Sequence, residues 1–171
     1  MNFYKAIMIL IILLGAISQH VVHEYSHILV AKLNGIRTIK VQWFTYPKFL
    51  LGTRVFFENE PEFGEEIIER KWGWVAIAGF VSTTLVGYTL IIIYILFSKH
   101  IPNWLVMVIC FFSMAFLTFD SLYFALRSIF SFGDITGVRK AFGIKKLTSI
   151  LVSMIILSFN FLLIRLIWYS L

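Results

Sequence analysis

The chain has 171 residues, of which 60% are apolar and only 14% are charged. About a hundred apolar side chains exceed what a soluble domain of this length can bury, whereas four membrane-spanning helices of roughly 20–25 residues would use about 80–100 of them. This composition excludes a secreted globule, a disordered tail and a large domain outside the bilayer. The net charge of +6 would suggest nucleic acid in a soluble chain. In a chain this apolar, the positive charge instead indicates how the protein is oriented in a membrane. We therefore expect the lipid bilayer, and no nucleic acid, as a partner.

Four apolar segments are each long enough to cross about 30 Å of hydrocarbon. They cover approximately residues 6–31, 73–97, 103–129 and 147–169. We therefore predict an all-α polytopic membrane protein with four transmembrane helices. No internal repeat or low-complexity linker divides the sequence, so residues 1–171 are expected to form a single membrane-embedded domain.

The basic residues are unevenly distributed over the ends of these segments. Twelve of the fifteen lie in the stretches 32–71 and 127–146, and the other three are Lys5, Lys99 and Arg165. Because loops rich in lysine and arginine are retained in the cytoplasm, both basic stretches are predicted to be cytoplasmic. Both termini are then expected outside.

The loop between the first two spans has the alternation of a β-hairpin. Apolar side chains recur near every second position over residues 36–43 and again over 51–57. The tripeptide Tyr46-Pro47-Lys48 between them is typical of a turn. We predict a short β-hairpin between the first and second transmembrane helices.

The first span contains His23-Glu24-Tyr25-Ser26-His27, an H-E-x-x-H pattern. Residues four apart on a helix share a face, so the two imidazoles can bind one Zn²⁺ at about 2.0–2.1 Å while Glu24 leans toward the open coordination position. Such polar side chains are costly within a bilayer and are retained mainly where they have partners, water or a function. The pattern predicts a zinc site with His23 and His27 as ligands and Glu24 as general base. A polar patch that only holds helices together is the competing interpretation.

A catalytic zinc needs a third protein ligand, for which a carboxylate is usual after this pattern. The chain has two aspartates. Asp120 lies mid-span at a depth close to that of His23 and His27, whereas Asp134 lies between two glycines that would let the backbone turn its carboxylate toward a neighbouring helix. Asp120 could instead make an interhelical hydrogen bond or pair with nearby Arg127, and Asp134 could be a helix cap or a loop carboxylate. His20, one turn before His23, is expected to line a pore or support a ligand rather than bind zinc.

In these features the chain resembles the site-2 protease family of intramembrane zinc metalloproteases. His23-Glu24-Tyr25-Ser26-His27 matches that family's zinc motif in full, and a hairpin, a span and an aspartate follow in the family's order. Ala78-Gly79 matches the first two residues of its Ala-Gly-Pro-x-x-Asn motif, and Gly133-Asp134 is similar to its aspartate with adjacent glycine. The resemblance implies that His23, His27 and Asp134 bind zinc and that Glu24 activates water.

The sequence thus predicts a zinc metalloendopeptidase that cleaves a peptide bond in or next to a transmembrane segment of a membrane-protein or membrane-bound peptide substrate. The zinc would lie roughly 9–15 Å from the cytoplasmic end of its helix, so water is expected to enter from the cytoplasmic side. A non-enzymatic membrane metal-binding or assembly protein is one alternative. A small ion or proton transporter, with the histidines and Glu24 as its path, is another.

Overall fold

The computed structural model describes residues 3–43, 53–61 and 69–170. Four long helices cover most of this chain, and a short helix and a two-stranded sheet complete it. The elements in chain order are α1 (Phe3–Leu33), β1 (Thr38–Gln42), β2 (Arg54–Phe57), α2 (Arg70–Phe97), α3 (Asn103–Phe130), α4 (Asp134–Phe142) and α5 (Lys146–Ser170). The ends of all four long helices lie within three residues of the predicted ones, so the predicted fold class is confirmed.

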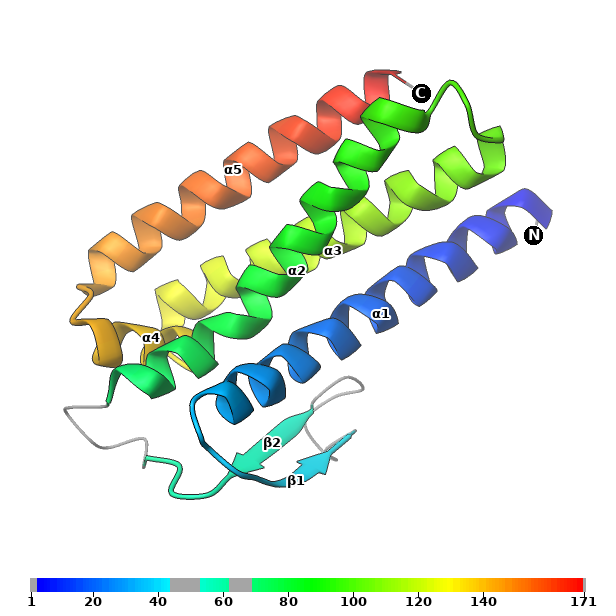
Figure 1. Ribbon diagram of the computed structural model, residues 1–171. Helices are drawn as coiled ribbons and strands as arrows, with labels where there is room; N and C mark the ends of the chain where they lie inside the picture. The colour runs from blue at the N-terminus through cyan, green and yellow to red at the C-terminus, as the bar shows by residue number, and fades with distance from the viewer. Residues whose placement is uncertain (1–2, 44–52, 62–68, 171) are drawn as a thin grey trace.

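The four long helices run side by side as a bundle (Figure 1). Helix α2 packs against α1 and α3, while α5 packs mainly against α3. Helix α1 begins and α5 ends at the same end of the bundle, and the sheet and α4 lie at the opposite end. Each long helix contains 24–28 residues suited to a bilayer, which at the rise of an α-helix is about 36–42 Å. The chain is therefore built as an integral, multi-pass membrane protein.

Apolar side chains on the outer faces and small or polar ones inside the bundle explain how these helices pack. Large residues such as Leu85, Ile95 and Leu162 are exposed, as expected of side chains that face lipid. Between α3 and α5, the hydroxyls of Ser128 and Ser153 are hydrogen-bonded at 2.7 Å. Such contacts hold helices together where the hydrophobic effect does not distinguish lipid from protein.

The predicted hairpin between α1 and α2 is confirmed as the antiparallel pair β1 and β2, in which Val41 pairs with Val55. Gly35, with φ of +72°, turns the chain from the end of α1 toward β1. The predicted turn at Tyr46-Pro47-Lys48 lies outside the described residues. Apolar packing of Ile36 with Trp72 ties the base of the hairpin to the start of α2.

The junction of α3 and α4 fixes the direction of the chain at the second aspartate. Helix α3 ends at Phe130, and Ser131 after it has a left-handed backbone with φ of 58°, as does Gly133 with φ of 67°. Asp134 is then the first residue of α4. The predicted break in the backbone is thus limited to residues 131–133, and Gly137, expected to help unwind the chain, is helical. Its missing side chain lets α4 pack on Ala76 of α2, since a Cβ at Gly137 would lie 3.2 Å from that of Ala76.

Candidate metal centre

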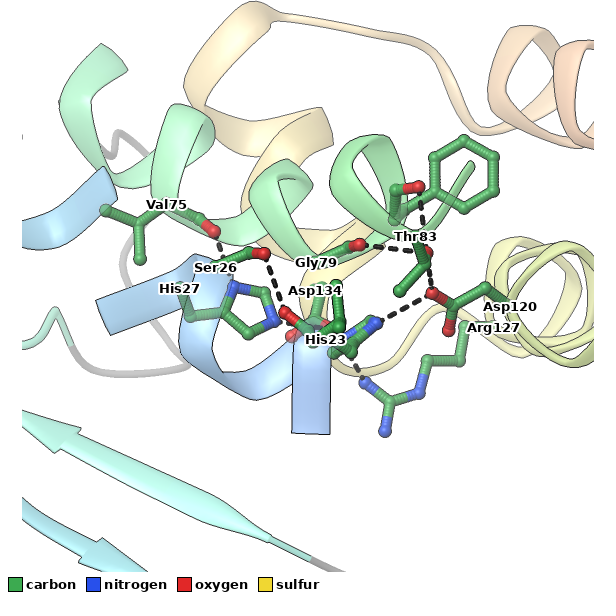
Figure 2. Close-up of polar contacts among 11 residues, drawn as sticks. His23, Ser26, His27, Val75, Gly79, Thr83, Asp120, Arg127 and Asp134 are labelled. Carbon is green, nitrogen blue, oxygen red and sulfur yellow. Dashed lines mark hydrogen bonds and ion pairs between the residues drawn. The ribbon is translucent and has the colours of Figure 1, made fainter. Parts of the chain in front are cut away.

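Helix α1 presents His23 and His27 on one face, one turn apart, toward α2 and α4 (Figure 2). Both side chains are buried, each with 7% of its surface exposed. Their rings are 4.8 Å apart between centroids and meet edge to face at 72°. The predicted pairing of the two imidazoles on one helix face is therefore present in the fold.

The tautomer of His27 follows from its hydrogen bond. Its Nδ1 lies 2.6 Å from the backbone carbonyl oxygen of Val75 on α2. A carbonyl oxygen only accepts, so Nδ1 must carry the hydrogen and donate it. In the neutral ring Nε2 then keeps its lone pair, which is the form that a metal ion requires.

His23 is oriented in the same way by a side chain from a third helix. Its Nδ1 lies 2.9 Å from Oδ2 of Asp120 on α3, and this contact is buried. The hydroxyl of Thr83 on α2 contacts the same carboxylate oxygen. A carboxylate behind an imidazole fixes the ring and increases the basicity of its other nitrogen, as in the carboxylate–histidine pairs of known metal sites. Nε2 of His23 is thus also left available.

Asp134 completes the group from the first turn of α4. Its Oδ2 lies 3.6 Å from Nε2 of His23 and 4.0 Å from Nε2 of His27. All three ligand atoms lie within 4.8 Å of one another. In a tetrahedral zinc site the ligand atoms are about 3.3 Å apart, so only small side-chain movements separate the observed positions from coordination. The buried group His23, His27 and Asp134 could therefore hold a metal ion.

The electrostatic surroundings keep Asp134 ionised. Burial by itself opposes the negative charge, but the hydrogen bond with His23, the charge that His27 carries when protonated and the charge of Arg127 outweigh it and lower the pKa of Asp134 to about 2. Nη1 of Arg127 lies 3.3 Å from Oδ2 of Asp134. At neutral pH the carboxylate is charged and ready to act as a ligand.

The structure assigns different places to the two aspartates that the sequence left as alternatives. Asp134 lies with the two Nε2 atoms, whereas Asp120 contacts the far side of His23 through Nδ1. The similar depth of Asp120 and His23 in their helices correctly indicated that the two residues lie close together, since Asp120 reaches His23. It did not distinguish a residue that faces the candidate ion from one that supports a ligand.

His20 takes no part in the group of ligand atoms. Its Nε2 lies 2.7 Å from the hydroxyl of Thr53, just before β2. The ring of Trp43 lies 6.5 Å from that of His20 between centroids. His20 thus joins α1 to the hairpin, a role that its helical spacing alone did not indicate.

A cavity of about 260 Å³ opens beside the candidate ligands. Glu24 lines it together with His23 and His27, and its side chain is half-buried. Thr53, Val55 and Phe57 line the side toward the hairpin, and the remaining wall comes from α2, α3, α4, the junction at Gly133 and the segment of Glu60 and Pro61. Glu24 of the H-E-x-x-H pattern therefore faces the same cavity as the two imidazoles.

Gly79 on α2 is required for this close packing. A Cβ at Gly79 would lie 2.5 Å from Nε2 of His23, closer than any real contact. Thr83, one turn further, reaches Asp120. In the sequence, Gly79 and Thr83 are small residues four apart, a spacing that by itself indicates close helix packing. The supporting contacts of Thr83 and of the Val75 carbonyl depend on the helix arrangement and have no signal in the sequence.

Comparisons with family models, with curated proteins and with solved structures find no match. The similarity to site-2 proteases is therefore limited to the residues and the order of elements given above. What the site does is inferred from its own chemistry.

Proposed function

We propose that this chain is an intramembrane zinc metalloendopeptidase, which hydrolyses a peptide bond in or next to a transmembrane segment of its substrate. The observation that carries the proposal is the convergence of two Nε2 atoms and one carboxylate oxygen within 4.8 Å. Both Nδ1 atoms are tied to acceptors behind them, so each ring offers its free nitrogen to the same point.

The donor set fits zinc in a catalytic rather than a structural site. Two histidines and one carboxylate are three protein ligands, which leave the fourth tetrahedral position open, whereas structural zinc sites have four protein ligands. When bound, the metal would supply a Lewis acid that lowers the pKa of a water molecule and polarises the scissile carbonyl.

Glu24 is suited to move the proton in this reaction. It lines the cavity beside both histidines, where its carboxylate would accept a proton as a water oxygen attacks the carbonyl carbon. The same proton then passes to the nitrogen of the leaving amine as the C–N bond breaks. Glu24 ends the cycle in its starting form, so the residues named so far account for every proton.

The cavity wall suggests how a substrate strand would be held. Thr53, Val55 and Phe57 alternate along the chain, so one face of β2 is directed at the cavity. The N–H of Glu58 donates to the carbonyl of Arg37 at 2.9 Å on the β1 side, which leaves the N–H groups of Val55 and Phe57 on the other edge. Among the described residues no strand pairs with that edge. An unwound substrate segment would add to it as a further strand, beside the candidate ligands.

The proposed orientation follows from the charges of the loops. The candidate ligands on α1 lie 6 to 10 residues before its end at Leu33, which is about 9–15 Å along the helix. The hairpin and α4 lie at this end of the bundle, and both belong to the basic stretches expected in the cytoplasm. We propose that water reaches the site from the cytoplasm and that both termini are outside.

The experiment that tests this function measures zinc content and peptide cleavage together. The detergent-purified protein should contain about one zinc per chain, and His23→Ala should remove it. Glu24→Gln should keep the zinc and lose several orders of magnitude in cleavage of dye-quenched single-span peptides. A metal carrier or assembly protein would tolerate Glu24→Gln in its own function and cleave no peptide. A folded wild-type protein without zinc would refute the protease proposal and favour the transporter.

A further inference from the structure

Arg127 places a guanidinium on the cavity wall, and no step of the proposed hydrolysis uses it. Its side chain is 19% exposed, and Nη1 lies 3.3 Å from Oδ2 of Asp134. Nε is fully buried and has no hydrogen-bond partner within the part of the chain that the structure describes. The guanidinium thus directs one donor at a candidate metal ligand, and the side chain lines the cavity beside it.

Two neighbours hold this guanidinium in place (Figure 2 shows its position beside Asp134). The centroid of the Tyr123 ring, one turn earlier on α3, lies 3.6 Å from Cζ of Arg127. Gly133 gives it room, since a Cβ there would collide with Nη1. The backbone of Gly133, with φ of 67°, also disfavours any other residue. The position of the guanidinium is therefore built into the junction between α3 and α4.

A half-buried cation next to a metal site needs an anion. Asp134 balances this positive charge only in part, because its Oδ2 also faces Nε2 of His23 at 3.6 Å and Nε2 of His27 at 4.0 Å. Peptide hydrolysis creates a second anion in this space, since the carbonyl oxygen becomes negatively charged when the tetrahedral intermediate forms. We propose that Arg127 donates hydrogen bonds to that oxyanion. This inference rests on the proposed function.

The balance of the step shows why Arg127 would act on the transition state. As the water oxygen bonds to the carbonyl carbon, the π electrons move to the carbonyl oxygen and Glu24 takes the proton. Negative charge therefore moves from Glu24 to the oxyanion, while Arg127 stays protonated throughout. When the C–N bond breaks, the carbonyl reforms and Glu24 returns the proton to the amine. Donors aimed at the oxyanion bind the neutral carbonyl weakly and the intermediate strongly, which is the condition for accelerating the reaction.

The test compares a mimic of the oxyanion with a mimic of the substrate, and it does not depend on turnover. The full chain in detergent is loaded with Co²⁺, whose visible absorption reports ligand binding. A leucyl-leucine phosphoramidate, which carries a tetrahedral anion, is titrated directly, and the matched amide is titrated by competition. Arg127→Gln should weaken phosphoramidate binding about 100- to 1,000-fold, the usual effect of losing one oxyanion donor. Binding of the amide and of cobalt should be unchanged.

Two further variants separate charge, fold and position. Arg127→Lys keeps the charge without the planar fork and should lose less phosphoramidate affinity than Arg127→Gln. Arg139→Gln is the matched control, because Arg139 is also half-buried with an unpaired Nε but donates to Ser131 and does not line the cavity. It should bind the phosphoramidate as the wild type does.

Every other result counts against the inference in a defined way. If Arg127→Gln loses cobalt, or weakens both probes equally, Arg127 is a positioning or packing residue and the oxyanion role is refuted. A cobalt-loaded wild type that does not bind the phosphoramidate refutes it as well. If the wild type takes up no metal, the proposed function itself fails.

Discussion

The two aspartates near His23 provide the sharpest prediction, because the structure gives them different tasks. Asp134 directs Oδ2 at the Nε2 atoms of both histidines, 3.6 and 4.0 Å away. Asp120 instead accepts the Nδ1 hydrogen of His23 at 2.9 Å. Asp134→Ala removes one of the three proposed ligands and should abolish stoichiometric zinc. Asp120→Ala removes a support and should leave zinc bound more weakly.

The size of the Asp120 effect can be estimated from the contact. Loss of a partner that orients a metal-binding histidine typically weakens metal affinity about 10- to 100-fold, which is about 1.4–2.7 kcal/mol at 25 °C. Asp120→Asn should fall near the lower limit, because its amide oxygen can still accept from Nδ1 while the charge is lost. The hydroxyl of Thr83 donates to the same oxygen, so the amide oxygen of Asn in this place can accept from both donors and only the charge is lost.

The measurement is a zinc dissociation constant from competition with a chromogenic chelator in metal-buffered detergent solution. Ser113→Ala is the matched control, because Ser113 is buried on the same helix and donates only to the backbone carbonyl of Ile109. It should leave zinc affinity unchanged. Equal losses in Asp120→Ala and Asp134→Ala would refute the division of tasks, and full zinc binding in Asp134→Ala would refute the assignment of the third ligand.

Two further predictions concern the hairpin and the metal. Val55→Pro removes an N–H from the edge of β2 that faces away from β1. It should lower peptide cleavage at least about fivefold, because one hydrogen bond contributes about 1 kcal/mol, and it should leave zinc bound. Val55→Ala, which keeps that N–H, should retain more activity; full activity of Val55→Pro would exclude strand addition at this edge. Removal of zinc by a chelator should lower the melting temperature by roughly 5–10 °C, since binding at 100 times the dissociation constant adds about 2.7 kcal/mol. The double variant His23→Ala, His27→Ala should melt at one temperature with or without the chelator, and a chelator effect that persists there would show that the metal binds elsewhere.

The helices and the first half of the site were predictable because they depend on local patterns. Spans follow from apolar runs of fixed length, and His23 and His27 follow from a spacing of four on one helix. The hairpin was visible in the alternation of apolar residues around Val41 and Val55. Each of these signals lies within about thirty residues of sequence and needs no knowledge of the neighbouring helices.

The second half of the site depends on how the helices pack, which the sequence did not determine. Asp134 reaches the histidines only because the chain turns at Gly133, and Asp120 reaches the back of His23 because α3 crosses α1 at that depth. Arg127 lies seven residues from each aspartate in the sequence, and in the fold it pairs with Asp134. The turn between α3 and α4 places the carboxylate of Asp134 next to the guanidinium of Arg127.

The charges gathered around the cavity support a divalent ion on independent grounds. Counted with their ordinary charges, the carboxylates of Glu24, Glu60 and Asp134 on the cavity wall and of Asp120 behind His23 give −4, and the cavity-lining Arg127 and Lys140 give +2. The histidines are neutral in the tautomers that their Nδ1 bonds require of metal ligands. A net charge of −2 inside a membrane protein is expensive, and one divalent cation between the two Nε2 atoms and Asp134 would cancel it. The drop in melting temperature on chelation is expected for this reason, since removing the ion leaves four carboxylates facing only two basic side chains.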